Sequence, residues 1–350
     1  MAQDEKQLKI FHGPINICGI GSNLSNWQKH KGAISDFITF SENKLASNSA
    51  YCLHLEKYPR ILRPFIKLAF FSLCLTKYDI FHFYYGTSFL PYQLDFPVLK
   101  LFRKKIIMTY CGSEARLIEV ERERNLYWDL LTISLDDPKF DNKKKWTMRW
   151  HKLWVDRAIA PRNLYASVSQ IYPASKIEKD LWVHNLINLG DYNPTYSSNP
   201  IPLLVHAPSE GGIKGSLYVE RAITKLEDEG YEFNYQRIEN MAHDLAIELY
   251  KQADIILDQF LLGGFGTLAA EGMAMGKPVV GYIIDEVRQE HFPDCPVVNA
   301  TIDTLEVVLA DLIVNPDKRI EIGRKGRVFV EQHLDNESVN KKLWDVYHSL

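Results

Sequence analysis

The sequence has 350 residues, which at roughly 150 residues per domain favours about two domains. Hydrophobic residues make up 46% and charged residues 24%, a composition that excludes a disordered or fibrous chain. Lys and Arg number 41 against 44 Asp and Glu, so the formal net charge is -3. A chain without a broad positive field is not expected to bind nucleic acid.

The cysteines are far apart in the sequence, and none forms a Cys-x-x-Cys pair of the kind used in zinc or redox sites. They are Cys18, Cys52, Cys74, Cys111 and Cys295. We expect free thiols in a reducing cytoplasm, with the inner face of a membrane as an alternative location. The sequence has no His-Glu-x-x-His motif, EF-hand loop or Asp-x-Asp element, so no metal site is predicted.

Apolar runs that end near glycine predict buried strands in the first half, at residues 8–13, 78–86 and 104–112. The glycine-containing loop GPINICGIGSN follows the first of them. Residues 119–157 are charged and rich in tryptophan, which favours helices with a solvated face.

Residues 58–75 combine basic side chains with many apolar ones. The basic residues are Arg60, Arg63 and Lys67. The apolar core of this stretch, residues 65–75, is too short to span a membrane. Two interpretations stay open: a helix packed against the first sheet, and a surface that rests on a membrane carrying a lipid-linked molecule.

A segment rich in Pro, Ser and Asn at residues 192–202 predicts a linker, and a second strand–helix series follows it. Strands are expected at residues 203–208, 233–238, 253–259 and 277–283, and helices at 216–229, 242–252, 264–276, 302–315, 316–333 and 337–350. This alternation predicts an α/β protein with parallel sheets. Ligands of such sheets bind outside the carboxyl ends of the strands.

The segment GGFGTLAAEGMAMGKPVVGY, residues 263–282, is the most informative part of the sequence. Its first glycines allow a ligand to approach the backbone where a helix begins, and the free N–H groups there suit a phosphate. Glu271 follows Thr267 by four residues, so both occupy one helical face. A carboxylate among small apolar residues needs hydrogen-bond donors, which sugar hydroxyls would supply. The alternative is a core helix on which Glu271 is simply solvated.

This segment resembles the donor-binding motif of the family-4 glycosyltransferases, which have the two-domain GT-B fold. The resemblance implies that Glu271 holds the ribose of a nucleotide-sugar and that the glycine-rich helix start faces its diphosphate. The donor-binding residues are then Lys214, Gly264, Phe265, Gly266, Thr267 and Glu271. Many members of the family have another glutamate where this chain has Gly263.

A second match is HAPSEGGIKGSLYVERAI, residues 206–223. The family usually has an arginine and a lysine here that neutralise the diphosphate. Lys214 matches the lysine, whereas the arginine position is Gly211. The alternative for Lys214 is an ordinary surface lysine.

The first half resembles the acceptor side of the same family more loosely. The resemblance implies that residues of this half line the cleft: Gly13, Asn16, Gly19, Cys111 and Glu114. In the second half, Asp258 and Gln259 end a predicted strand just before the glycine-rich loop, so we expect them to border the donor pocket as well. Cys111 to Glu114 stand where the family has His-Gly-Ser-Asp. Cys111 cannot make the hydrogen bonds of an imidazole.

We therefore predict an α/β protein of the GT-B class, with two doubly wound Rossmann-like domains facing a cleft. The domains would be residues 1–192 on the acceptor side and 193–335 on the nucleotide-sugar side, with a helix at 336–350 returning to the first domain. The predicted function is transfer of a sugar from a nucleotide-sugar, a co-substrate, to a saccharide or lipid-linked acceptor. By resemblance the reaction would retain anomeric configuration and need neither a metal nor a bound cofactor. No catalytic base is assigned.

Two alternatives stay open. Cys111, Gly211 and Gly263 fall where the family site has polar groups, so the chain could be a catalytically silent relative that binds a nucleotide or a protein partner. The other alternative is a sugar-nucleotide epimerase or a phosphorylase on the same fold.

Overall fold

The computed structural model describes residues 7–17, 19–42, 51–131, 138–291 and 293–350, and the prediction for Cys18 lies outside them. The chain divides into two compact units. Unit 1 comprises Met1–Leu117, Asp137–His184 and Val339–Leu350, and unit 2 comprises Ile118–Asp136 and Asn185–Ser338. Each unit is therefore discontinuous in sequence. The predicted domain ranges stay predictions.

Unit 1 is built on a parallel sheet with the strand order β3-β2-β1-β4-β5-β6-β7. The strands are β1 Lys9–Gly13, β2 Ile34–Thr39, β3 Tyr51–Cys52, β4 Ile80–Tyr84, β5 Lys105–Thr109, β6 Arg157–Ile159 and β7 Ile177–Glu178. All residues of β4 are buried, as expected for a parallel strand covered on both faces. The strands predicted at residues 8–13, 78–86 and 104–112 are confirmed.

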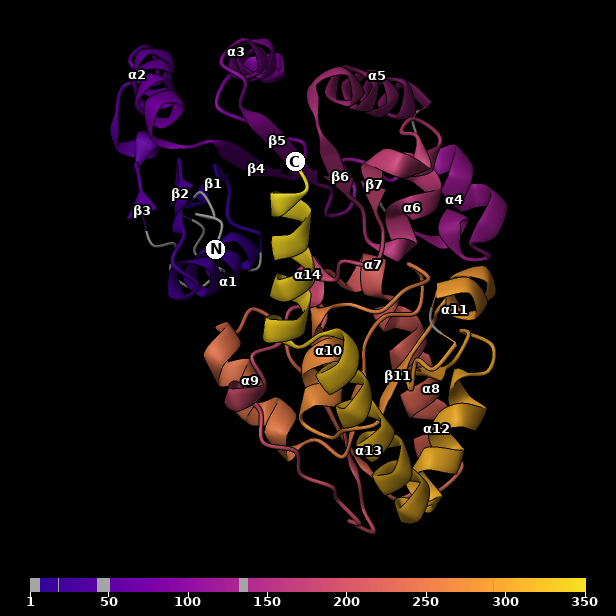
Figure 1. Ribbon diagram of the computed structural model, residues 1–350. Coiled ribbons are helices and arrows are strands. Elements are labelled where there is room, and N and C mark those ends of the chain that lie inside the picture. Colours follow the sequence, from indigo (N-terminus) through magenta and orange to yellow (C-terminus); the bar gives the residue numbers. More distant parts are fainter. Residues whose placement is uncertain (1–6, 18, 43–50, 132–137, 292) are drawn as a thin grey trace. The chain divides into compact units, whose positions relative to one another are not determined.

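The helices of unit 1 cover both faces of its sheet. They are α1 Ile20–His30, α2 Arg63–Lys77, α3 Asp95–Leu101, α5 Pro138–Trp154 and α6 Arg162–Ser169, with most of α14 Asn336–His348. Figure 1 shows α2, α3 and α5 on one side of the sheet and α1 on the other. Right-handed crossovers place helices on opposite faces of a sheet when the chain runs along the sheet in opposite directions. Here the chain runs one way along the sheet from β1 to β2 and the opposite way from β3 to β6.

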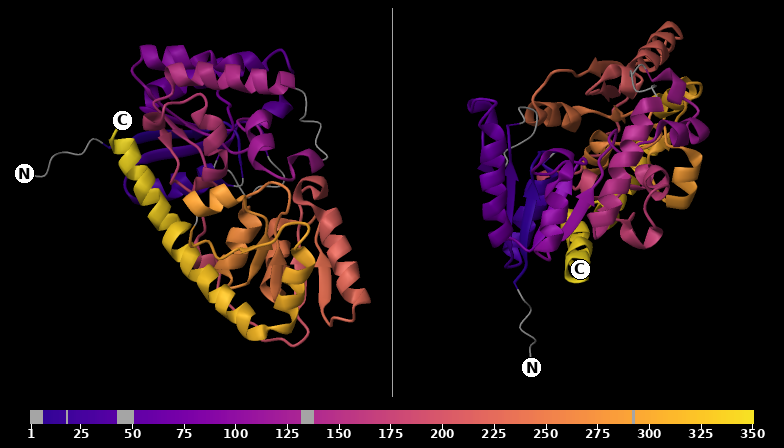
Figure 2. Two further views of the ribbon diagram at one scale, coloured as in Figure 1. Left: turned by 90° about the vertical axis from the view of Figure 1, so that its right-hand side faces the viewer. Right: turned by 90° about the horizontal axis from the view of Figure 1, so that it is seen from above.

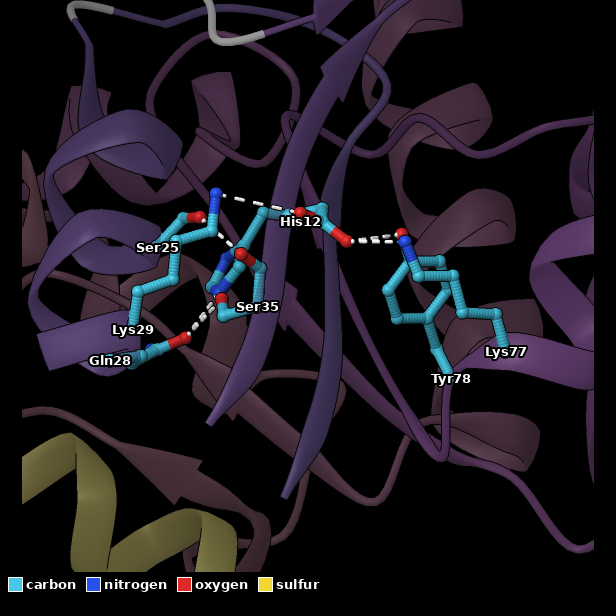
Figure 3. Close-up of polar contacts among 8 residues, drawn as sticks. His12, Ser25, Gln28, Lys29, Ser35, Lys77 and Tyr78 are labelled. Carbon is cyan, nitrogen blue, oxygen red and sulfur yellow. Dashed lines mark hydrogen bonds and ion pairs between the residues drawn. The ribbon is translucent and has the colours of Figure 1, made fainter. Parts of the chain in front are cut away.

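A buried polar network lies in the centre of unit 1. The imidazole of His12 contacts the Tyr84 hydroxyl through Nδ1 at 2.6 Å and the Gln28 amide oxygen through Nε2 at 2.8 Å. Ser35 donates to the same Gln28 oxygen at 2.7 Å (Figure 3). Burial lowers the pKa of His12 to about 4. The neutral ring therefore joins strands to helix α1 without placing a charge in the core.

Unit 2 has a parallel sheet with the strand order β12-β11-β10-β8-β9. Its strands are β8 Leu203–His206, β9 Asn234–Arg237, β10 Ile255–Leu257, β11 Val279–Gly281 and β12 Val298–Asn299. Its helices are α4 Ile118–Arg124, α7 Gly211–Lys214, α8 Ser216–Asp228, α9 His243–Gln252, α10 Thr267–Ala274, α11 Asp285–His291, α12 Leu305–Val314 and α13 Pro316–His333. Short 3-10 turns lie at Leu55–Lys57, Pro91–Gln93, Trp128–Leu130, Ala174–Lys176, Val183–Asn185 and Leu189–Asp191 of the whole chain.

The helices of unit 2 form two layers around its sheet. Helices α8 and α12 pack together on one face, while α10 and α13 lie side by side on the other (Figure 1 and Figure 2). The helix predicted at residues 264–276 begins only at Thr267, because Gly264 and Gly266 belong to the loop before it. The four-residue α7, which precedes α8, has no signature in the sequence.

Two expectations about the whole chain can be checked on the described residues. No helix among them is long and apolar enough to cross a membrane. No disulfide joins the described cysteines, which are Cys52, Cys74, Cys111 and Cys295.

Candidate functional site

The predicted donor-binding residues gather at the carboxyl edge of the sheet in unit 2. Strands β8 and β10 are paired neighbours, and they end at His206 and Leu257. The segment after β8 carries Lys214, and the segment after β10 begins with Asp258. Parallel strands place their carboxyl ends together, so these two segments meet at one edge.

Lys214 lies at the centre of this edge. Its ammonium donates to the Gln259 amide oxygen at 2.7 Å and lies 3.5 Å from a carboxylate oxygen of Asp258. The other oxygen of Asp258 accepts the Gly266 N–H at 2.7 Å, and the Gln259 amide donates to the Gly264 carbonyl oxygen. Lys214 is thus held in a polar cluster and is not an ordinary surface lysine. The structure brings these five predicted residues together.

Gly266 packs closely against this cluster. A Cβ atom there would lie 3.1 Å from Lys214 Nζ and 3.3 Å from Asp258 Oδ1, so a side chain would make these groups shift by a few tenths of an ångström. Gly266 is also the N-cap of α10 and offers no side chain to bind the first-turn N–H groups. Those groups, together with the helix dipole, favour an anion. Lys214 and the start of α10 therefore lie together around the Asp258 carboxylate, which balances the charge of the ammonium.

Glu271 is buried one turn further along α10, with 4% of its surface exposed. Its Oε1 accepts from His243 Nε2 at 2.7 Å and lies 3.4 Å from the Tyr192 hydroxyl, which donates to it. The hydrogen bond to Glu271 raises the pKa of His243, and burial beside this carboxylate raises that of Tyr192. The interpretation of Glu271 as solvated is wrong, because the protein itself supplies its donors.

His243 and Tyr192 are the residues that the sequence did not single out. His243 is the first residue of α9 and lies 28 positions before Glu271, and Tyr192 lies 79 positions before it. No local sequence motif marks His243 as a partner of Glu271. Phe265 and Thr267, two further predicted donor-binding residues, differ in burial. Phe265 is buried, and its ring centroid lies 6.3 Å from that of Phe329. Thr267 is half-buried.

The remaining predicted residues belong to unit 1. The side-chain oxygen of Asn16 accepts the Gly19 N–H at 3.0 Å, at the start of α1. Gly13 ends β1 with a φ of +152°, and a Cβ atom there would lie 2.2 Å from the Ile38 carbonyl oxygen. This close approach explains glycine at position 13.

Glu114 closes the loop that follows β5. Its carboxylate accepts the N–H of Gly112 at 2.8 Å and that of Cys111. Burial raises the pKa of Glu114 to about 7, while the two amides act in the opposite direction. Glu114 thus titrates near neutral pH and holds the backbone of the segment that stands where the family has His-Gly-Ser-Asp.

Two further features of the described residues bear on the site. They contain no group of three or more His, Cys, Asp or Glu that could hold a metal ion. A cavity of about 790 Å³ in unit 2 shares no residue with the cluster around Lys214. It lies between the segment 293–299 and helix α13.

Comparisons with known proteins identify the fold. No family model matches the sequence, and no curated protein matches it. Sucrose-phosphate synthase from Thermosynechococcus elongatus is similar in structure with a TM-score of 0.68 at 15% identity, over 98% of this chain and 99% of that chain. The chain has the GT-B fold of glycosyltransferases.

Other solved structures support the same assignment. HepE of Anabaena in complex with UDP and glucose gives a TM-score of 0.65 at 12% identity, over 98% of this chain and 100% of that chain. WaaG, a glycosyltransferase involved in lipopolysaccharide biosynthesis, gives 0.62 at 13% identity, over 97% and 99%. The predicted fold class is therefore confirmed, although the sequences have diverged widely.

Proposed function

We propose that this GT-B protein is a glycosyltransferase that moves a sugar from a nucleotide-sugar to a saccharide or lipid-linked acceptor. One observation carries the proposal: Lys214 and the Gly266 N–H converge on a single oxyanion, the Asp258 carboxylate, at the start of α10. Donors that hold carboxylate oxygens in this way suit phosphate oxygens as well. The complexes of the similarly folded HepE with UDP and with UDP-glucose support UDP as the first ligand to test.

In the proposed mechanism, Lys214 and the amides of residues 264–267 hold the diphosphate. Negative charge grows on this group as the bond to the sugar breaks, so a preorganised cation and amides stabilise the transition state more than the ground state. Glu271 holds the ribose hydroxyls, and His243 and Tyr192 fix the orientation of its carboxylate. The proposal includes retention of anomeric configuration and a reaction without metal.

The proposed acceptor is a saccharide or a lipid-linked molecule. Helix α2 supports the second kind, because it exposes Phe65, Leu68 and Leu73 by 50 to 69% of their surfaces. Large apolar side chains grouped on one helix suit contact with a membrane surface, where a lipid-linked acceptor would lie.

The experiment measures binding of UDP, GDP, ADP and CDP by calorimetry in the presence of EDTA. At least one of them should bind and raise the melting temperature, since a ligand that binds the native state stabilises it. Lys214→Ala and Glu271→Ala should each weaken binding by about 1.5–3 kcal/mol, the contribution of a hydrogen bond to a charged group. Lys251→Ala is the control, because Lys251 is exposed and pairs with Glu248 on α9.

Equal affinity in wild type and in both site variants would refute the site. The melting temperature of each variant without ligand separates a binding loss from a folding defect. Release of nucleoside diphosphate from a nucleotide-sugar with saccharide acceptors then distinguishes an enzyme from a silent relative. Binding without release above the level of Lys214→Ala would favour the silent relative.

A further inference from the structure

The space beside Gly211 of helix α7 is filled by an arginine from strand β9. A Cβ atom at Gly211 would lie 3.2 Å from Arg237 Nη2 and 3.1 Å from Ser216 Oγ. The guanidinium of Arg237 therefore occupies the position that a side chain at residue 211 would enter. Gly211 precedes Lys214 by three residues in α7, and residues three apart lie on the same face of a helix.

The register of the sheet brings Arg237 to this place. Arg237 is the last residue of β9 and pairs with His206, the last residue of the neighbouring β8. His206 Nε2 in turn contacts the Ser216 hydroxyl at 2.8 Å. Burial lowers the pKa of His206, and the charges of Lys214 and Arg237 lower it further. Both cations therefore act on the same buried ring at the carboxyl edge of unit 2.

Two carboxylates hold the guanidinium in position. Glu239 accepts from Arg237 Nη2 at 2.6 Å, and Glu220 accepts from Nη1 at 3.4 Å. Within the part of the chain that the structure describes, these bonds use two of the five N–H donors. The Arg237 side chain is 36% exposed, so a ligand can reach it. The two carboxylates balance the single positive charge of Arg237, so its contribution to a ligand would be directed hydrogen bonds.

We propose that Arg237 supplies the second cation of the diphosphate site, in place of a cation at position 211. The proposal rests on the proposed nucleotide-sugar function and adds a residue from a different strand to it. Lys214 and Arg237 would bind the diphosphate together, the first from α7 and the second from the end of β9. A guanidinium suits this role because its planar set of donors matches phosphate oxygens.

The test compares the dissociation constants of UDP and uridine for wild type, Arg237→Ala and the double variant Arg237→Ala/Gly211→Arg. Arg237→Ala should weaken UDP binding about tenfold and leave uridine binding unchanged, since only UDP carries phosphates. The double variant should bind UDP more tightly than Arg237→Ala does. The reason is that an arginine at position 211 lies beside the space that the Arg237 side chain leaves. Gly211 is not among the glycines with positive φ, so its backbone accepts an arginine.

Arg221→Ala is the matched control, because Arg221 lies on α8 over the Tyr218 ring. Unchanged UDP affinity in Arg237→Ala, with a clear loss in Lys214→Ala, would overturn the role of Arg237 and leave the proposed function standing. An equal loss for UDP and uridine would show a structural role and would also overturn it. If wild type binds none of UDP, GDP, ADP and CDP, the proposed function and this inference both fail.

Discussion

At the scale of residues, Gly263 stands at a position where many family-4 glycosyltransferases have a glutamate. Its φ is +70°, a left-handed conformation that L-residues adopt only at a cost. A Cβ atom there would lie 2.4 Å from Cγ1 of the buried Ile284. Glutamate is therefore excluded by the backbone and by the packing, so in the proposed function the contacts to the sugar must come from other positions.

Gly263→Ala tests this exclusion, with Gly230→Ala as the matched control. Gly230 has a φ of +83°, and no atom lies within 4 Å of its added Cβ. We expect Gly230→Ala to lower the free energy of unfolding by about 1–2 kcal/mol, the cost of the left-handed backbone alone. Gly263→Ala should lose about 1–3 kcal/mol more, because the added carbon overpacks the core. Urea denaturation measures both, and equal losses would mean that Ile284 moves away at no cost.

At the scale of elements, helix α2 packs against the first sheet, as one interpretation of residues 58–75 predicted, and contact with a membrane stays a prediction. Phe71 and Cys74 are buried and pack the helix into unit 1. Phe65 is 68% exposed and Leu73 is 69% exposed. One face of the helix thus belongs to the core, while the other is apolar and solvent-exposed. Arg60 and Arg63 near its start would favour anionic lipids.

We expect the protein to co-sediment with vesicles that contain phosphatidylglycerol, and Phe65→Glu/Leu68→Glu to reduce this binding about tenfold or more. The reason is that burial of each apolar side chain contributes about 1.5–3 kcal/mol and the new charges repel anionic lipid. The control is Val307→Glu, because Val307 is an equally exposed apolar residue on α12 of unit 2. A wild-type protein that stays in the supernatant, or an equal loss in the control, would contradict membrane contact through α2.

At the scale of the whole molecule, buried neutral histidines make the stability depend on pH. Burial lowers the pKa of His12 to about 4 and that of His151 to about 3, and it lowers those of His82 and His206 as well. The unfolded chain binds protons at its histidines near pH 6.5, whereas the native protein does not. His82 also contacts the Tyr347 hydroxyl at 2.6 Å and thereby connects β4 to the C-terminal helix α14.

The free energy of unfolding should therefore be independent of these histidines above about pH 6.5 and should fall as the pH drops from 6.5 toward 4. Each unit of pKa difference corresponds to about 1.4 kcal/mol. His12→Gln should flatten this dependence, whereas His30→Gln should not, because His30 is exposed. Urea denaturation at several pH values between 7.5 and 5 measures the slope. The same slope in His12→Gln and wild type would refute the contribution of His12.

Much of the fold and part of the site could be predicted from the sequence. Runs of apolar residues predict buried segments, and glycines predict the places where the chain turns. These local patterns correctly predicted the strands at residues 203–208 and 253–259. The glycine-rich segment and Lys214 lie in two short segments after neighbouring strands, so their proximity could be expected from the sequence. That they bind the diphosphate of a donor stays a prediction. The resemblance to GT-B glycosyltransferases then followed from those same segments.

Only the tertiary structure decided which distant side chains lie at the candidate site. His243 and Tyr192 reach Glu271 from other elements, and Arg237 reaches Gly211 through the pairing of β9 with β8. Periodicity tells which residues of one segment are buried, but it carries no information on strand order or register. Those are fixed by the packing of the whole unit, and they determine which polar groups lie within hydrogen-bond distance at its carboxyl edge.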